Sequence, residues 1–330
     1  MTDIIDFNDA VRRSIGPRHL LMGNGFSVAC HREFSYKSLY DVVGDFIPAH
    51  IRPLFSNTVN FEAIMSQLSN TKNVVKLYGN TYGPLCDELS ESIQALRKAL
   101  VDGILSVHPL TRDSIAVASW DNCSRFLQNF HLFFTTNYDL LLYWAFDHEY
   151  FLKLIGGPHD GPDNVMITPG DIEESRIHYM HGAIHLYPEG TDINAFSYAA
   201  AIDRGRIGMI QEAARRGVFP VIITEGTSEQ KYALIKQDWY LKGCYNKLRR
   251  QKGSLFVYGF SASHEHDNHI LRAIADSNIQ QLIVGVYQGP GADEEDNWRM
   301  IHEFEMIARR KKTKHLDVIF YDAESAQVWR

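Results

Sequence analysis

Apolar, strand-like runs alternate with helical stretches along much of this chain, and that alternation limits the possible fold more than any other feature. Residues 197–216 and 297–309 show helical patterns between such runs. Strands that are almost continuously apolar are typical of a parallel sheet covered on both faces. We therefore expect an α/β fold, with a Rossmann-like, mostly parallel sheet and helices on both faces. The expected strands are residues 18–22, 131–136, 151–155, 176–180, 218–224, 254–258, 281–287 and 315–321.

The region from 37 to 130 has few strand candidates and a mostly helical pattern. Residues 88–100 carry apolar side chains at helical spacing, and Asn60 stands in a capping position before another helix. We expect a helical insertion over 37–130, after the first sheet strand, and a short amphipathic helix over 4–14. No linker divides the chain, so residues 1–330 are expected to form a single domain.

The charge and cysteine content argue against several classes of protein. The formal net charge is −7, so direct binding of nucleic acid through a basic surface is not expected. No run approaches the ~18–20 apolar residues of a membrane-spanning helix, and the first residues are not expected to be a signal peptide. The cysteines lie far apart without a CxxC pair, which excludes a zinc ribbon and does not indicate a disulfide framework. We expect a cytoplasmic protein.

The first strand ends in a glycine turn, Gly23-Asn24-Gly25, which is followed by Phe26 and Ser27. Glycines after a strand let the backbone turn tightly and approach a diphosphate, while the next helix offers free N–H groups to the charge. Ser27 brings a hydroxyl for a phosphate or a ribose, or it caps the helix. A plain structural turn is the alternative for this motif.

The second strand ends in the sequence Thr-Thr-Asn-Tyr-Asp, residues 135–139. Asn137 has both a donor and an acceptor, which suits the positioning of a ribose hydroxyl or a water molecule. Asn137 or Asp139 could instead cap the apolar helix that follows. Capping explains one of these two polar side chains but not both.

The expected strand 176–180 leads directly into His181, and Gly182 leaves space beside the imidazole. A histidine at the carboxyl end of a strand is well placed to act as a general base. The alternative is a core histidine that bonds to the backbone. His178 and His185 flank it, but their spacing suits one face of a helix, so a metal site in this expected strand is not favoured.

The fourth motif is the turn Gly259-Phe260-Ser261, which follows the expected strand 254–258. After it, Asp267 is a candidate N-cap for a helix over 268–275. In an open α/β sheet the carboxyl ends of the strands face one crevice. We therefore expect all these motifs to share one nucleotide site.

Three histidines that follow this turn leave a metallohydrolase as a distant alternative. They are similar to the HxHxDH ligand set of metallo-β-lactamase-type hydrolases, but Asp267 and Asn268 are transposed relative to that set. The histidines are His264, His266 and His269.

Together these motifs resemble the sirtuin-like NAD-binding fold. Sirtuins carry a GAGxS turn, a TQNxD segment, an HG step and a later GTS or GxS turn, in that order. The similar stretches here are residues 23–27, 135–139, 181–182 and 259–261. Longer stretches, such as RHLLMGNGFS, FTTNYDLLLYWAF and VYGFSASHEHDNHIL, resemble a family of uncharacterised bacterial proteins within that fold, and they are spread from residue 18 to residue 271.

The chain departs from deacylating sirtuins and is more similar to the sirtuin-like NAD hydrolases of bacterial antiphage systems. It lacks the four-cysteine ribbon and a clear counterpart of the PDFR-like segment, and the gap between Asn137 and His181 is longer. The resemblance implies NAD⁺ as the substrate, nicotinamide and ADP-ribose as products, and depletion of NAD in infected cells. It also implies a homo-oligomer, a possible partner such as a translocase-type ATPase, and no zinc or other cofactor.

We assign three catalytic residues on this basis. Asn137 would orient the ribose and a water, His181 would accept a proton, and Asp139 would contact the carboxamide or stabilise the developing positive charge. Two alternatives remain: a sensor that binds NAD or an ADP-ribose derivative without cleaving it, and a subunit of a larger defence complex. The residues expected to bind the rest of the dinucleotide are Gly23, Asn24, Gly25, Phe26, Ser27, Thr136, Gly259 and Ser261.

Overall fold

The computed structural model describes residues 3–146, 166–167, 171–189, 192–195, 205–216, 218–224, 227–311 and 315–330. The main sheet is built from β1 (Ile4–Ile5), β2 (Arg18–Met22), β3 (Leu132–Thr135), β5 (Ile177–Tyr179), β8 (Lys252–Tyr258), β9 (Asn278–Val286) and β10 (Asp317–Asp322). The longer helices outside the insertion are α1 (Phe7–Arg13), α10 (Gly205–Arg215), α11 (Ser228–Gln237), α12 (Trp239–Arg249), α13 (His264–Asp276) and α14 (Glu294–Arg310).

Within the described residues, seven strands form one sheet in the order β1-β10-β9-β8-β2-β3-β5, and every pairing in it is parallel. The central strands β2, β3 and β8 are almost wholly buried. The expected α/β fold with a parallel sheet is therefore confirmed. From β2 the chain adds strands on one side of the sheet, and from β8 it adds them on the other side. The strand order therefore reverses between the neighbours β2 and β8.

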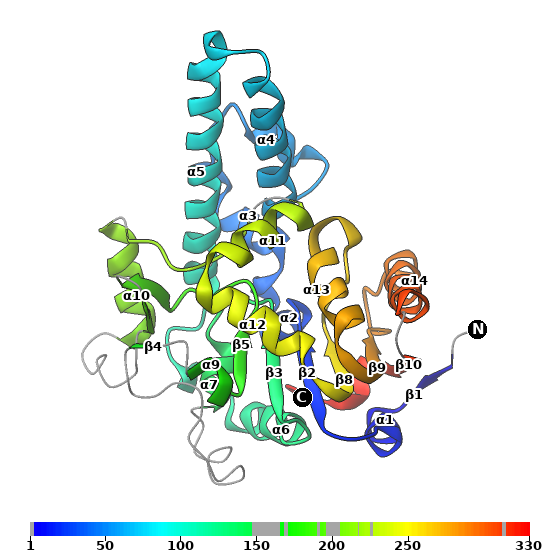
Figure 1. Cartoon of the computed structure of the whole chain (residues 1–330). Coiled ribbons are helices and arrows are strands. Elements are labelled where there is room, and N and C mark those ends of the chain that lie inside the picture. The colour runs from blue at the N-terminus through cyan, green and yellow to red at the C-terminus, as the bar shows by residue number, and fades with distance from the viewer. Residues whose placement is uncertain are drawn as a thin grey trace.

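Helices cover both faces of this sheet (Figure 1). On one face α12, α13 and α14 form a packed layer. On the other face, Phe7 of α1 meets Phe126 of α6 (Val117–Leu127) and the sheet side chains Phe256 and Tyr321. Aromatic side chains of this size remove large apolar areas from water, so this cluster binds the covering helices to the sheet.

Between β2 and β3 the chain is helical, as expected for the insertion. Asn60 caps α4 by accepting from the N–H groups of Glu62 and Ala63, as its position indicates. In Figure 1, α4 and α5 project from the body as an antiparallel pair, beyond the carboxyl ends of the strands. The elements are α2 (Gly25–Cys30), η1 (Arg32–Phe34), α3 (Tyr36–Val43), η2 (Gly44–Phe46), η3 (Arg52–Ser56), α4 (Phe61–Lys76), η4 (Asn80–Tyr82), α5 (Gly83–Val107), η5 (Arg112–Ser114) and α6.

One expected strand is wrong. Residues 218–224 do not join the main sheet but cross beside the turn that follows β5, with a single bridge between Gly182 and Ile222. Gly182 has a φ of +79°, and a Cβ there would lie 1.8 Å from the carbonyl oxygen of Val221. The apolar run is therefore buried against this turn, which apolar composition alone does not distinguish from pairing in a sheet.

Several smaller elements complete the fold. The expected N-terminal helix begins only at Phe7, because Ile4 and Ile5 pair with β10. The expected strand over 151–155 lies outside the described residues. A second, antiparallel sheet joins β4, β7 and β6, and the remaining elements are short helices. These elements are β4 (Met166–Ile167), β6 (Leu186–Glu189), β7 (Asp192–Ala195), α7 (Leu141–Phe146), α9 (Asp171–Glu174) and η7 (Ala323–Ala326).

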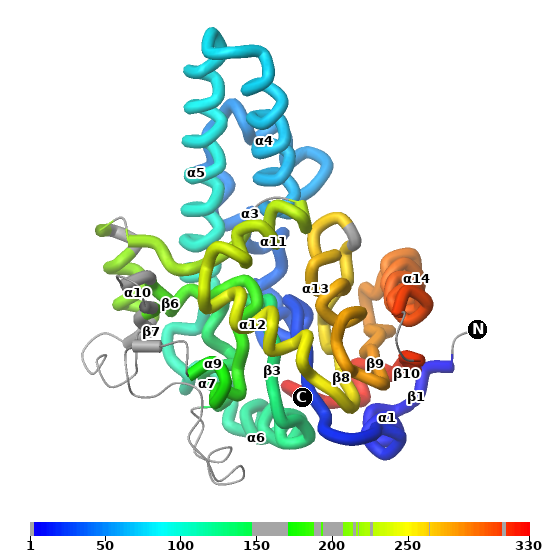
Figure 2. The backbone as a smooth tube through the Cα atoms, in the orientation of Figure 1, coloured from blue at the N-terminus to red at the C-terminus, as the bar shows by residue number. Residues whose placement is uncertain are grey.

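Figure 2 shows the backbone passing from β2 up into the insertion and back to β3, so that the insertion stands over the strand ends. In the part of the chain that the structure describes, no helix is long and apolar enough to cross a membrane.

Candidate functional site

A cavity of about 290 Å³ lies at the carboxyl ends of the central strands. Counted along the chain from β2, the strands of the main sheet stand in the order 3-2-1-4-5-6, with β1 at the far edge. Sheets of this order bind dinucleotides where the order reverses, which is here between β2 and β8. The strand-end residues that line the cavity are Asn24, Gly25, Thr136, Asn137, Asp139, His181, Gly259 and Ser261.

The insertion supplies much of the remaining wall. The cavity thus lies between the strand ends of the sheet and the helices that stand over them. The lining residues from this region are Phe34, Tyr36, Leu39, Asn60, Glu62, Leu100 and Ile104.

The glycine turn after β2 packs against the turn after β8. A Cβ on Gly25 would lie 2.6 Å from the Cα of Gly259, and the N–H of Gly25 donates to the Gly259 carbonyl over 2.8 Å. The next N–H groups, of Phe26 and Ser27, bond to carbonyls within the same turn. These glycines therefore allow two backbones to meet closely. The expected contact of the turn with a diphosphate stays a prediction.

Three buried side chains form a chain of hydrogen bonds below the cavity. Ser27 donates to Oδ2 of Asp139 over 2.5 Å, and Nδ2 of Asn137 donates to the Ser27 oxygen over 2.8 Å. Because the one hydroxyl proton of Ser27 goes to the carboxylate, Ser27 accepts from the amide nitrogen of Asn137, and the amide orientation is set. The Oδ1 atom of Asn137 is then left buried, with no hydrogen-bond partner in the described structure.

Asp139 supports this arrangement from a second side. Its Oδ1 accepts from the N–H of Leu141, so it caps the start of α7, as the capping alternative proposes. Burial raises the pKa of Asp139, while the hydrogen bonds from Ser27 and Leu141 oppose that rise. With both oxygens engaged, Asp139 acts on Asn137 through Ser27 in this structure.

Replacing Ser27 with alanine is expected to destabilise the fold by about 1–3 kcal/mol, because it leaves the Asp139 carboxylate short of a donor. It is also expected to release the Asn137 amide from its set orientation. Thermal denaturation measures the first effect, and ligand binding measures the second. Ser90→Ala on α5 is the control, since the Ser90 hydroxyl donates to the carbonyl of Cys86 within the same helix. Equal small effects of both substitutions would contradict this account of Ser27.

His181 belongs to a second buried chain of polar groups. Its Nε2 lies 2.8 Å from Nε2 of His269, and Nδ1 of His269 lies 3.0 Å from the Ser228 hydroxyl. Burial lowers the pKa of His181 well below its ordinary value, and the nearby Lys231 ammonium lowers it further. His181 is therefore a neutral imidazole at pH 7, the form that accepts a proton.

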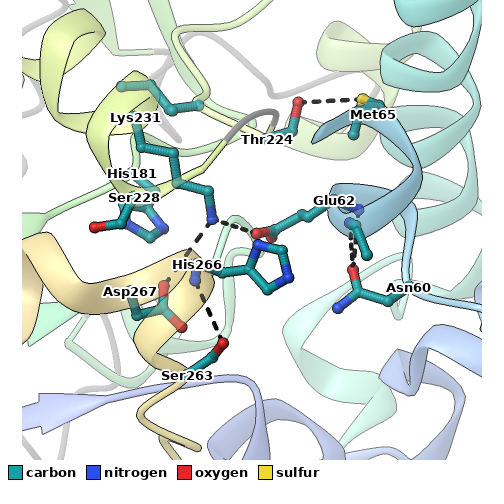
Figure 3. A network of polar contacts seen from close by, with 12 residues as sticks. Asn60, Glu62, Met65, His181, Thr224, Ser228, Lys231, Ser263, His266 and Asp267 are labelled. Carbon is teal, nitrogen blue, oxygen red and sulfur yellow. Dashed lines mark hydrogen bonds and ion pairs between the residues drawn. The ribbon is translucent and has the colours of Figure 1, made fainter. Parts of the chain in front are cut away.

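A buried ammonium group joins three elements beside His181, as Figure 3 shows. Lys231 of α11 has a fully buried side chain, and its Nζ donates to Oε2 of Glu62 on α4 over 2.5 Å. It also lies 4.0 Å from a carboxylate oxygen of Asp267 on α13. Tyr36 and Tyr138 direct their hydroxyls at the other oxygen of Glu62, each over 3.0 Å. This cluster holds the insertion against the body at the cavity wall.

The expected capping role of Asp267 is wrong. The helix α13 begins at His264, before Asp267 rather than after it, and Ser263 caps the helix by accepting from the N–H of His266. Ser263, immediately before the first histidine, competes for the same role, and here it prevails. Asp267 is thus free to face Lys231 from the first turn of α13.

The stability of the fold is expected to depend on the ionisation of Asp267. Burial raises its pKa to about 6; the Lys231 ammonium opposes this rise and Glu62 adds to it. Because the folded pKa lies above the ordinary value of about 3.9, the ionised form costs stability above pH 6, and that cost disappears as the pH falls toward 4. Asp267→Asn is expected to stabilise the protein on the order of 1–3 kcal/mol at pH 7.5 and much less at pH 4.5.

Denaturant titration at the two pH values measures this difference. Asp276→Asn provides the control, because Asp276 is an exposed residue on the same helix. A stabilisation by Asp267→Asn that is the same at pH 4.5 and pH 7.5 would contradict the account.

Three of the residues expected at the site do not line the cavity. Gly23 supports the turn, Phe26 packs in the core against Trp329, and Ser27 lies below Asn137. The sequence reasoning missed Glu62 and Lys231, which are 169 residues apart. Lys231 does end the stretch FPVIITEGTSEQK, residues 219–231, which also resembles the uncharacterised family.

Within the described residues, no group of three or more His, Cys, Asp or Glu side chains is placed to hold a metal ion. His178 stacks on Phe134 inside the sheet, and His266 and His269 lie on different sides of the first turns of α13, toward the cavity and toward His181. The absence of zinc stays a prediction.

The sequence model of one protein family, described as a domain of unknown function (DUF4917), matches residues 20–329 of the chain. The chain belongs to the DUF4917 family. No curated protein matches it. The DUF4917 match begins inside β2 and ends beyond η7, so it includes β3, β5, β8, β9, β10 and the end of β2, and contains all the residues that line the cavity.

Proposed function

We propose that this protein cleaves the bond between nicotinamide and ribose in NAD⁺. The observation that carries the proposal is the buried Oδ1 of Asn137, an acceptor that has no partner among the described residues and lies in a cavity where the strand order reverses. A buried acceptor that lacks a partner costs stability and is expected to have a ligand or a water as its partner. His181 lines the same cavity and brings a neutral imidazole.

The chemistry needs little from the protein at the leaving group. Nicotinamide leaves from a cationic pyridinium, so the electrons of the broken C–N bond neutralise its ring without acid catalysis. The ribose carbon then resembles an oxocarbenium ion and takes the oxygen of a water molecule. Asn137 orients the ribose and that water, and His181 accepts the water proton, which gives nicotinamide and ADP-ribose.

The likeness to the sirtuin-like NAD hydrolases of antiphage systems supports the same proposal. The motifs that carry this likeness end β2, β3, β5 and β8, and residues from all four line one cavity. We further propose that the protein depletes NAD in infected bacteria. Five of the residues that the likeness assigns to substrate binding also line the cavity: Asn24, Gly25, Thr136, Gly259 and Ser261.

Two measurements on the purified chain separate an enzyme from a sensor. Chromatography of a reaction with NAD⁺ detects released nicotinamide, and calorimetry detects saturable binding. The proposal predicts both. Saturable binding of NAD⁺ without release, under every condition that keeps the protein folded, would favour the sensor instead.

A specific observation also favours a subunit of a larger complex. Apolar side chains are exposed at the tip of the projecting α4–α5 pair (Figure 1), where Leu77 is 84% and Tyr78 is 71% exposed. Exposed apolar clusters of this kind mark protein–protein contacts. Size-exclusion chromatography compares the wild type with the double variant Leu77→Ser/Tyr78→Ser. Runs of each protein alone test for a homo-oligomer, and runs with a translocase-type ATPase test for that partner. Identical elution of both forms in every mixture would exclude a role for the tip.

A further inference from the structure

The cavity wall is rich in hydrogen-bond acceptors and has no basic side chain. Among the described residues that line it are the carboxylates of Glu62, Asp139 and Asp267, and there is no Lys or Arg. The nearest ammonium group, that of Lys231, lies behind the wall with no exposed surface and is paired with Glu62. A diphosphate placed inside would meet carboxylates without a compensating cation, which is unfavourable.

The three carboxylates differ in what they have left to offer a ligand. Both oxygens of Asp139 are engaged by Ser27 and Leu141, and both oxygens of Glu62 are engaged by Lys231 and two tyrosines. Asp267 lies 4.0 Å from Lys231, and its carboxylate accepts no hydrogen bond within the described part of the chain. Asp267 is thus the carboxylate of this wall with free acceptor capacity.

Two further polar atoms at the same cavity lack partners. Oδ1 of Asn137 and Nδ1 of His266 are buried without a hydrogen bond in the described structure, and Asn137 is 8% exposed. Asn137 Oδ1 is an acceptor, as is the Asp267 carboxylate. A ligand that satisfies both must bring donors, such as the hydroxyls of a ribose, and a positive charge would suit the carboxylates.

The size of the cavity limits the ligand as well. At about 290 Å³ it lies at the lower end of ligand pockets, which hold roughly 300–1,000 Å³. It therefore suits a group of nucleoside size rather than a whole dinucleotide.

We propose that this cavity takes the cationic ribosyl-pyridinium half of the substrate, and that Asp267 is the residue that selects it. Asp267 accepts hydrogen bonds from the ribose hydroxyls and, with Glu62, favours the pyridinium charge, while the phosphates lie outside the carboxylate wall. This rests on the proposed cleavage of NAD⁺ and names the recognised class: N-ribosyl pyridinium compounds, whether or not a second nucleotide is attached.

Binding of two uncleavable nucleosides at pH 7.5 tests the proposal. Carbocyclic nicotinamide riboside keeps the positive charge and the hydroxyls, whereas benzamide riboside is a neutral molecule of nearly the same shape. Calorimetry is expected to show the cationic nucleoside binding ~10-fold or more tightly than the neutral one. Asp267→Asn is expected to lose ~10-fold for the cationic nucleoside and to abolish the preference, while Asp276→Asn retains it.

The folding of each variant is checked by its melting temperature, and Asp267→Ser serves as a second variant. An unchanged ratio of the two affinities in both folded Asp267 variants would overturn the proposal. The proposal would also be overturned if the protein bound ADP-ribose but did not bind the cationic nucleoside. Failure of the proposed function has a different signature, since no nicotinamide would then be released from NAD⁺ even if the charge preference were present.

Discussion

Replacement of His181 with alanine is expected to lower the rate of nicotinamide release from NAD⁺ by ~10²–10⁴-fold, the usual contribution of a general base. His181 lines the cavity, and burial together with the Lys231 ammonium keeps it neutral. Its removal leaves the attacking water without a proton acceptor, whereas the binding of NAD⁺ is expected to change little. Initial rates and calorimetry on the same preparation separate the two effects.

The matched control for this substitution is His131→Ala. His131 is exposed and stands at the opposite end of β3 from the cavity, so its loss is expected to leave the rate unchanged. A His181→Ala protein that releases nicotinamide at the wild-type rate would remove His181 from the chemistry. A variant that also fails to bind NAD⁺ would show a role in binding instead.

Replacement of Lys231 with methionine is expected to be the most destabilising change, by about 3–5 kcal/mol, because it leaves buried carboxylates without a cation. Burial by itself raises the pKa of Glu62, but the Lys231 ammonium and the tyrosine hydroxyls outweigh burial and lower it. Without Lys231 only the hydroxyls oppose burial. Urea denaturation of the wild type and of Lys231→Met at pH 7.5 measures the loss.

Lys98→Met is the control, because Lys98 forms an exposed pair with Asp102 on α5, and such pairs contribute ~0–1 kcal/mol. The pH dependence gives a second check. In the wild type the lowered pKa of Glu62 means that its contribution is present above the ordinary pKa and is lost as the pH falls. In Lys231→Met, protonation of the carboxylates relieves the unpaired charge, so the difference between the two proteins is expected to narrow toward low pH. A gap that stays constant with pH would contradict the pairing.

The parallel sheet was predictable because its strands are buried on both faces and are therefore apolar along their whole length. The position of Asn137 and His181 on the wall of one cavity followed from the same geometry, since parallel strands bring their carboxyl ends to one edge. The segment 218–224 was misjudged for the same reason: an apolar run that is buried beside Gly182 has the composition of a strand.

The pairing of Glu62 with Lys231 had no local signature. The two residues stand on helices that are far apart in sequence, and charged residues on helices are usually solvated, so only the packing of the insertion against α11 reveals a buried pair. Ser27 illustrates a related limit. Its position after the glycine turn predicts a hydroxyl near the site, but the direction of that hydroxyl depends on Asp139, which lies 112 residues away.

Nicotinamide release from NAD⁺ by the purified chain, measured beside Asn137→Ala, tests the central claim most directly. Asn73→Ala, at an exposed position on α4, is the control for the substitution itself. The account predicts release by the wild type and by Asn73→Ala, and a loss of ~10²-fold or more in Asn137→Ala, because the ribose and the water lose the group that orients them. Release that is equal in all three proteins would contradict the assignment of this cavity as the site of cleavage.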